Sequence, residues 1–501
     1  MSGRPSPAAL PVVILMTSNG AGMGHLARLA AVAGAAGSAG PAGSAGFAPL
    51  LLSMSTALAT VSASSGLPAE YCPGPARQWL RTDVWHRYLE RRLVALVRET
   101  GATTLAFDGT SPYPGLLAAR RALPDLRMVW SRRGLWRADA SRAPLRTTGY
   151  FDLVVEPGDL ASPADHGPTA GLTGTTRVGP VTLLETEPLL GRAEARAELG
   201  LDPDRPTLLV SLGAGSINDP GAAMSAAVTT ALATPDWQVA LTKAPIAWRE
   251  LPEQVRARVT VLDGVYPLAS YLAAFDAAVS AAGYNGVHEL LLAGVPTLLV
   301  PNTATSTDDQ VARATFVAER GWALVAAEDD VAAVAAGVRE LLSATGREAL
   351  AAATAGLPRP AGAGQTAALV AALAAGGERR ELPRDGYQPL RSASALVRRA
   401  VGESAWEQAR RLARGPARQL GSGPLPVLET EGEVPAGFRR LVVTRELAEV
   451  STAENVVVEH VLAQGSDAYL RARRVIIAAS YPGGARDRSG GSDGRTSKGT
   501  A

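Results

Sequence analysis

The sequence predicts an α/β protein in which two doubly wound parallel sheets face each other across a cleft, with a C-terminal extension after them. Three observations carry this prediction. Short apolar runs alternate with helix-like stretches from the beginning of the chain, the same alternation starts again near Pro206, and each half has a Gly-rich turn directly after its first apolar run. Alternation of this kind is typical of parallel sheets, because two parallel strands need a crossover connection between them.

The first half, predicted as residues 1–180, begins with the apolar run Pro11–Met16, which has the composition of a buried strand. The Gly-rich turn Asn19–Gly24 follows and leads into an Ala- and Leu-rich helix at His25–Ala36. Apolar residues at helical spacing indicate another helix at Val84–Glu99. The other strands predicted in this half are Phe47–Met54, Thr103–Phe107, Leu126–Trp130 and Leu153–Val155.

The second half, predicted as residues 181–375, repeats the pattern. A strand at Thr207–Leu212 is followed by the Gly-rich turn Gly213–Asp219 and by a helix at Gly221–Leu232. Further strands are predicted at Trp237–Thr242, Val259–Leu262, Ala277–Ser280 and Thr297–Val300. Two similar doubly wound halves leave a cleft between them, where a ligand site is expected.

The extension, residues 376–480, is basic. Glu378–Arg418 contains ten Arg and five acidic residues, an excess of +5. Ser394–Arg414 can be drawn as a helix with a narrow, Ala-rich apolar stripe, which favours packing back on the first half; the alternative is contact with an anionic membrane surface. Residues 481–501 are rich in Gly, Ser and Arg, and a disordered tail is expected there.

Composition narrows the class of protein further. The 501 residues include 49 basic and 47 acidic side chains, and a net charge of +2 does not predict binding to nucleic acid. A single cysteine, Cys72, excludes an internal disulfide framework. The first apolar run is too short for a signal peptide, and no run reaches the ~18 residues of a membrane span. We therefore expect a cytoplasmic protein, with peripheral contact to the inner face of the membrane as an alternative.

The first Gly-rich turn, Asn19-Gly20-Ala21-Gly22-Met23-Gly24-His25, lies between a strand and a helix, where backbone amides can approach an anion. It does not fit the dinucleotide fingerprint, because the third glycine would fall on His25 and no acidic residue precedes Glu70. A Walker motif is excluded because no Gly-Lys-Ser/Thr follows. The turn therefore presents a histidine at the mouth of a sheet, either as a functional group or as a structural one.

The most informative stretch runs from Ser280-Ala281-Ala282-Gly283-Tyr284-Asn285-Gly286-Val287-His288-Glu289-Leu290 through Gly294-Val295-Pro296 to Asp308-Asp309-Gln310. This pattern resembles the nucleotide-sugar-binding segment of GT-B glycosyltransferases, and it is most similar to family 28. The first Gly-rich turn resembles the first loop of the same enzymes. The resemblance covers roughly residues 11–375 and implies two Rossmann-like domains, the second of which binds the nucleotide sugar.

The resemblance also implies roles for individual residues. Glu289 would accept hydrogen bonds from the ribose hydroxyls, and Asp309 and Gln310 would hold hydroxyls of the donor sugar. The other implied donor contacts are Gly283, Tyr284, Asn285 and Gly286 at the diphosphate, Gly213, Ala214, Gly215 and Ser216 in the phosphate cradle, and Val265 and Tyr266 near the base. Gly20, Gly22 and Gly24 would form the acceptor-side loop. Two positions depart from the family pattern: Arg313 stands where the family has Asn, and Ala281 where it has Arg or His.

No metal and no cofactor are expected besides the nucleotide sugar, which is a co-substrate. The partial positive charge of a helix N-terminus can stabilise the leaving diphosphate without a metal ion. Metal-dependent transferases of the other main fold use an Asp-x-Asp triplet. The candidate here, Asp202-Pro203-Asp204, precedes a strand and is interpreted as a turn.

These features predict an inverting glycosyltransferase that uses a nucleotide-diphosphate sugar, most simply a UDP sugar, and a small-molecule or lipid-linked acceptor. His25 would be the general base, with Asp108 as its orienting partner or as an acceptor contact; the alternative for Asp108 is a turn residue. Trp130, Arg132, Arg133 and Trp136 would line the acceptor pocket or only the edge of the sheet, and His288 is expected to fill space. A UDP-sugar 2-epimerase and a non-catalytic nucleotide-sugar-binding protein remain as alternative functions.

Overall fold

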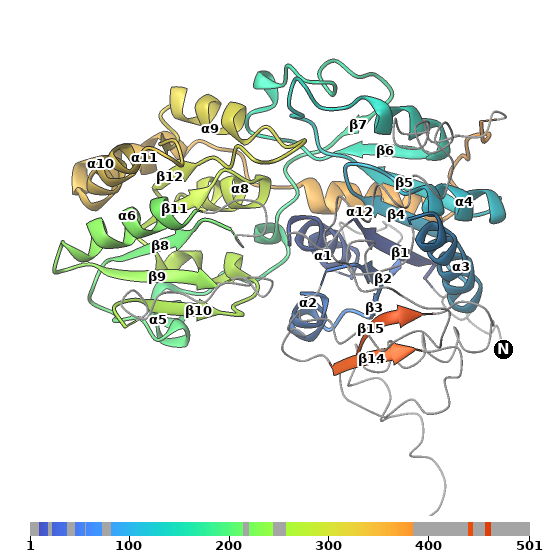
Figure 1. Ribbon diagram of the computed structural model, residues 1–501, viewed down its shortest axis with the longest axis horizontal. Helices are drawn as coiled ribbons and strands as arrows, with labels where there is room; N and C mark the ends of the chain where they lie inside the picture. The colour runs from blue at the N-terminus through green and yellow to red at the C-terminus, as the bar shows by residue number, and fades with distance from the viewer. Residues whose placement is uncertain are drawn as a thin grey trace, which may run out of the picture.

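The computed structural model describes the chain in nine segments. They are residues 10–18, 23–37, 46–55, 57–72, 82–213, 220–243, 257–383, 439–443 and 456–461. Two parallel sheets flanked by helices form its two halves (Figure 1). The predicted α/β fold with two doubly wound sheets is confirmed.

The first sheet has seven strands in the order β3-β2-β1-β4-β5-β6-β7, and every pairing is parallel. Its strands are β1 (Val12–Thr17), β2 (Ala48–Ser53), β3 (Ala69–Tyr71), β4 (Thr104–Asp108), β5 (Arg127–Ser131), β6 (Leu153–Glu156) and β7 (Thr176–Arg177). Strand order reverses between β1 and β4, where Thr17 pairs with Asp108 at the carboxyl ends. Such a reversal opens a crevice in which ligands bind.

Helices cover both faces of this sheet. They are α1 (Gly24–Gly37), α2 (Leu58–Ser65), α3 (Thr82–Thr100) and α4 (Pro114–Ala122), with 3-10 turns η2 (Ala143–Tyr150), η3 (Ser162–Ala164) and η4 (Leu183–Glu185). Strand β1 is buried almost throughout, which agrees with its continuous apolar run. Helix α1 begins at Gly24, so His25 lies in its first turn, beside the carboxyl end of β1.

The second sheet has six strands, all parallel, in the order β10-β9-β8-β11-β12-β13. Its strands are β8 (Thr207–Ser211), β9 (Gln238–Lys243), β10 (Thr260–Asp263), β11 (Ala277–Ala281), β12 (Thr297–Val300) and β13 (Leu324–Val325). Its helical elements are α5 (Arg192–Leu199), α6 (Gly221–Leu232), η5 (Leu268–Ala274), α8 (Tyr284–Leu292), α9 (Gln310–Glu319), α10 (Val331–Leu342) and α11 (Ala344–Thr354). Here the order reverses between β8 and β11, so the turns after these two strands face the crevice.

Helix α12 (Gly362–Ala374) departs from the predicted domain boundary at residue 375. It crosses back and packs against α1, and Val370 and Ala371 are buried in the core of the first half (Figure 1). Glu185 caps its N-terminus by accepting hydrogen bonds from the backbone amides of Ala363 and Gly364, at 2.8 and 2.7 Å. The second half therefore ends before α12.

Within the predicted extension, β14 (Arg439–Val443) and β15 (Val456–Val461) form a two-stranded parallel sheet. The predicted basic helix Ser394–Arg414 and the predicted tail, residues 481–501, lie outside the described residues. Of the helices in the described segments, none has both the length and the apolar composition that a membrane crossing requires.

The chain passes from one half to the other twice, near Pro180 and near Gly362, and the two crossing segments are hydrogen-bonded to each other. The amide of Gly362 donates to the carbonyl of Pro180 at 3.2 Å, and the amide of Gly179 donates to the side chain of Gln365 at 2.7 Å. A Cβ atom at position 362 would overlap the carbonyl oxygen of Gly179. Because the obstacle is backbone, it cannot be relieved by a side-chain rotation.

We expect Gly362→Ala to lower the free energy of unfolding by about 2 kcal/mol or more, at the upper end of overpacking costs, because the two crossing segments must separate. Urea denaturation measures this loss. Gly356→Ala is the matched control, since Gly356 is exposed and has no atom within 4 Å of an added Cβ. Equal stabilities of the two variants would contradict the expectation.

Candidate functional site

A pocket opens between the two halves, at the carboxyl ends of β4 and β5 and the first turn of α1. Its empty volume, including the open mouth, is about 240 Å³. The first half contributes His25, Arg28, Asp108, Gly109, Thr110, Ser131, Arg133 and Trp136, and the second half contributes Thr307 and Asp308. The pocket is therefore composite, and the relative placement of the halves decides its shape.

His25 and Asp108 meet in this pocket. His25 Nδ1 lies 2.5 Å from Asp108 Oδ1, and the side chains are 20% and 1% exposed. The two atoms would repel each other at this distance without a shared proton, so Nδ1 donates to the carboxylate and the lone pair is on Nε2. The structure thus brings together the two residues predicted as a catalytic pair, 83 positions apart in the sequence.

The surrounding charges set the protonation of this pair. Burial opposes ionisation of Asp108, but Arg28 and His25 outweigh it and hold the pKa of the carboxyl well below its usual range. Burial lowers the pKa of His25; Asp108 opposes this effect, whereas Arg28 and Arg133 add to it. At neutral pH the arrangement is a carboxylate beside a neutral imidazole, which can accept a proton.

The predicted diphosphate turn contacts α1 at Gly24, the residue before His25. Gly283 is the N-cap residue of α8, and the side-chain amide of Asn285 donates to the carbonyl of Gly24 at 3.4 Å. Gly213 lies two residues after β8 and has a φ of 87°, a left-handed conformation that favours glycine. The other residues of the two Gly-rich turns, which are Gly20, Gly22, Ala214, Gly215 and Ser216, lie outside the described residues.

Tyr284 has a structural side chain. Its hydroxyl accepts from the amide of Val181 at 2.9 Å and donates to the carbonyl of Gly158 at 2.8 Å. The phenol is buried and joins α8 to the first crossing between the halves. Only its backbone amide, in the first turn of α8, remains for the predicted contact with a diphosphate.

Glu289 lies on α8, half-buried. Burial raises its pKa to about 7, against a smaller opposing effect of a hydrogen bond from the backbone of Leu183. Tyr266 lies close enough for the charge of Glu289 to raise the pKa of its phenol, after burial and the charge of Glu187. The predicted ribose contact, Glu289, and Tyr266 of the predicted base-binding segment therefore lie near each other.

The two predicted sugar-binding residues are partly committed to other contacts. Asp309 is the N-cap of α9 and accepts from the amide of Ala312 at 2.9 Å. Gln310 accepts from the amide of Asn302 at 3.0 Å, and its side-chain nitrogen lies near Gly283. Gln310 is thus placed at the diphosphate turn, whereas one oxygen of Asp309 is used to begin a helix.

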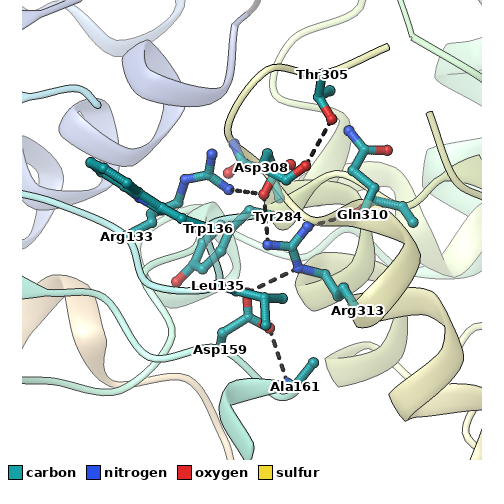
Figure 2. A network of polar contacts seen from close by, with 12 residues as sticks. Arg133, Leu135, Trp136, Asp159, Ala161, Tyr284, Thr305, Asp308, Gln310 and Arg313 are labelled. Carbon is teal, nitrogen blue, oxygen red and sulfur yellow. Dashed lines mark hydrogen bonds and ion pairs between the residues drawn. The ribbon is translucent and has the colours of Figure 1, made fainter. Parts of the chain in front are cut away.

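Arg313, noted in the sequence only as a departure from the family pattern, is the centre of a buried network (Figure 2). Its side chain is 0% exposed and donates to Asp159 at 2.9 Å, to Asp308 at 2.8 Å and to the carbonyl of Ala282 at 2.9 Å. Burial opposes its charge, but the two carboxylates outweigh burial and raise its pKa. Arg133 reaches Asp308 from the first half, at 2.9 Å.

Backbone contacts run beside this network. Trp136 and Asp308 form an antiparallel bridge, and the amide of Asp309 donates to the carbonyl of Leu135 at 3.0 Å. His288 lies behind it, donating from Nδ1 to the carbonyl of Tyr284 at 2.6 Å and accepting from the amide of Leu160 at 3.0 Å. As expected, the side chain of His288 fills space in the interior. Its hydrogen bond with Leu160 also joins the second half to the first.

Of the four residues suggested for the acceptor pocket, two line it and two have other contacts. Arg133 and Trp136 line the pocket. Trp130 donates to the carbonyl of Gly109 at 2.7 Å from a buried position, and Arg132 is paired with Glu156 at 3.0 Å. Sequence reasoning missed Arg28, which also lines the pocket. The feature of the sequence that could have pointed to Arg28 is an arginine within a helix otherwise rich in Ala and Leu.

The Asp202-Pro203-Asp204 triplet is a turn, in which the amide of Asp204 donates to the Asp202 carboxylate at 2.9 Å. In the segments that the structure describes, no group of three or more His, Cys, Asp or Glu side chains is arranged to hold a metal ion.

Comparisons with known proteins find relatives of the chain in one glycosyltransferase family. The model of the glycosyltransferase family 28 C-terminal domain matches residues 240–363. The UDP-N-acetylglucosamine–N-acetylmuramyl-(pentapeptide) pyrophosphoryl-undecaprenol N-acetylglucosamine transferase of Cutibacterium acnes is 30% identical over 294 residues, which are 55% of this chain and 73% of that protein. The enzyme of the same name from Exiguobacterium sibiricum is 25% identical over 166 residues, and the match spans 32% of this chain and 43% of that protein.

A solved structure supports the fold. A Listeria monocytogenes protein assigned as a UDP-N-acetylglucosamine 2-epimerase has a TM-score of 0.51 at 14% identity, covering 75% of this chain and 100% of its own. At this identity the likeness concerns the arrangement of the two sheets and does not distinguish between reactions.

The raised pKa of Glu289 has a consequence for stability. Its folded-state pKa of about 7 exceeds the ordinary value of 4.5, so the folded protein retains a proton that the unfolded chain releases. Stability from this group is present below pH 4.5 and is lost as the pH rises through 7. We expect Glu289→Gln to be more stable than the wild type at pH 8 by about 1–3 kcal/mol, with a much smaller difference at pH 5.

Urea unfolding of both proteins at the two pH values measures this effect. A difference between the proteins that is the same at pH 5 and pH 8 would mean that Glu289 ionises normally in the folded state.

Proposed function

The chain belongs to glycosyltransferase family 28, and from this premise we propose that it transfers a sugar from a UDP-linked donor to a hydroxyl acceptor, with inversion at the anomeric carbon and without a metal ion. The observation that carries the proposal is the His25–Asp108 pair, beside which the first turn of α8 contacts the first turn of α1. A base on one side and an anion-stabilising helix end on the other match the two ends of a displacement at the anomeric carbon.

In the proposed reaction His25 Nε2 accepts the proton of the acceptor hydroxyl as its oxygen attacks the anomeric carbon. Asp108 stabilises the imidazolium that forms. The bond between the anomeric carbon and the diphosphate oxygen breaks, and its electron pair leaves with the diphosphate. The amides in the first turn of α8 stabilise this growing negative charge, aided by the helix dipole.

The donor is proposed to lie along the second half, with its ribose hydroxyls at Glu289 and its base near Val265 and Tyr266. Support for a UDP donor and a lipid-linked acceptor comes from the names of the relatives, which pair UDP-N-acetylglucosamine with an undecaprenol-linked substrate. A lipid-linked acceptor would bring the protein to a membrane surface, and a small-molecule acceptor would not.

The epimerase alternative fits the site less well than a transferase does. Epimerisation would require carboxylates that are free to exchange protons, and the two pocket carboxylates, Asp108 and Asp308, are both held by arginines. Release of UDP distinguishes the functions: a transferase releases it in the presence of acceptor, whereas an epimerase in simple turnover and a binding protein do not.

We expect His25→Ala to lower turnover by about 10²–10⁴, the range of general-base catalysis, and to leave UDP affinity within a factor of about three. UDP release from the donor with a pool of acceptors measures turnover, and calorimetry measures affinity. His166→Ala is the matched control, because His166 is exposed and lies outside the pocket. A loss below tenfold would assign His25 to packing rather than to catalysis.

We expect Glu289→Ala to weaken UDP binding by ~1–3 kcal/mol, roughly tenfold or more, because the ribose hydroxyls lose a charged acceptor. Titration calorimetry at pH 8, where the carboxylate is ionised, gives the affinity. The control is Glu319→Ala, which removes an exposed carboxylate from α9. Unchanged UDP affinity in a folded Glu289→Ala protein would contradict the placement of the donor.

A further inference from the structure

Arg28 is a buried arginine of α1 that the proposed reaction does not use. It lies one helical turn after His25, and its side chain is 3% exposed. Burying a guanidinium is costly unless its N–H groups find acceptors. The contacts of Arg28 therefore indicate what holds it in the pocket wall.

Two of its nitrogens contact Asp108. Nε donates to Asp108 Oδ2 at 3.1 Å and Nη2 donates to Asp108 Oδ1 at 2.5 Å, so the guanidinium engages both oxygens of the carboxylate. Nη2 also lies 2.8 Å from His25 Nδ1, but this contact is not a hydrogen bond, because Nδ1 carries the proton that it donates to Asp108. Ser131 supplies one more hydrogen bond to Asp108 Oδ2, at 2.7 Å. A carboxylate held at both oxygens cannot rotate away from the imidazole.

The third nitrogen of Arg28 faces the second half. Nη1 lies 3.5 Å from the side-chain oxygen of Asn285, in the first turn of α8, and the guanidinium carbon lies 5.3 Å from the centre of the Tyr284 ring. One side chain thus touches the His25–Asp108 pair and the turn at which the diphosphate is proposed to bind.

We propose that Arg28 is a positioning residue, which locks the Asp108 carboxylate and the His25 ring in the orientation that leaves His25 Nε2 open to the acceptor. The proposal rests on the proposed function for the role of His25. The charged groups that face His25 are Asp108 from β4, Arg28 from α1, Arg133 after β5 and, across the pocket, Asp308. Arg28 is the cation in contact with both members of the pair.

Loss of Arg28 should change His25 in a predictable direction. Removing its positive charge relieves repulsion of the imidazolium and leaves the Asp108 charge less neutralised, so both effects raise the pKa of His25. The geometry changes as well, because Asp108 retains hydrogen bonds only from His25 and Ser131 among the contacts described above.

The first test needs no activity. NMR titration of the His25 ring, assigned with His25→Ala, is expected to show a pKa about one unit higher in Arg28→Gln than in the wild type. Ser131→Ala is the control: it removes a neutral hydrogen bond from the same carboxylate and should shift the pKa less. An unchanged His25 pKa in folded Arg28→Gln overturns the proposal, whether or not the protein proves to be a transferase.

The second test uses turnover and UDP affinity. We expect Arg28→Gln to lower kcat at least tenfold, to move the acidic limb of the pH–rate profile upward by about one unit, and to leave UDP affinity within threefold. A tenfold weaker UDP affinity with an unchanged pH profile would instead make Arg28 a ligand of the diphosphate and would overturn the positioning role.

Arg28→Lys separates the effect of the positive charge from the effect of the paired hydrogen bonds. It also replaces Arg28→Gln in both tests if that variant does not fold. A single ammonium keeps the charge but cannot make two parallel bonds to the carboxylate. We expect the pKa of His25 to stay within half a unit of the wild type while kcat falls at least tenfold. Wild-type turnover in Arg28→Lys would show that the paired contact has no positioning role.

Discussion

The buried ion pairs of Arg313 are the interaction on which the arrangement of the molecule depends. A guanidinium with no exposure must be compensated at close range, and here Asp159 comes from the first half while Asp308 and the Ala282 carbonyl come from the second. The same Asp308 accepts from Arg133, so each half supplies charges that the other must neutralise. The composite pocket exists because this network fixes how the halves meet.

The acidic groups of the site fall into two electrostatic classes. Asp108 and Asp308 are held ionised by neighbouring arginines, in spite of burial. Glu289 has no arginine or lysine paired with it among the described residues, and its pKa rises to about 7. The first class builds a fixed field around His25. The second class is a carboxyl group whose ionisation is unfavourable in the free protein. Hydrogen bonds from a ligand to the carboxylate would make its ionisation more favourable.

Much of the fold, and part of the site, could be predicted from the sequence. Alternation of apolar runs and helices, with a Gly-rich turn in each half, predicted both sheets, and the segment around Glu289 predicted the family; both are confirmed. The proximity of His25 and Asp108 followed from their places at the ends of neighbouring elements. Arg28 and Arg313 could not be assigned, because an arginine in an apolar helix is explained only by partners distant in the sequence. The crossing of α12 was missed because its composition resembles that of the helices of the second half.

Because α12 crosses back, the first half is not encoded by one continuous stretch of the gene. The core of the first half is completed by residues 363–374, which are encoded after the whole of the second half. No single cut in the chain separates two foldable units, and an exchange of acceptor-side halves between family members would have to carry two segments at once. The second half, by contrast, is a contiguous insertion, with its entry and exit hydrogen-bonded to each other at Pro180 and Gly362.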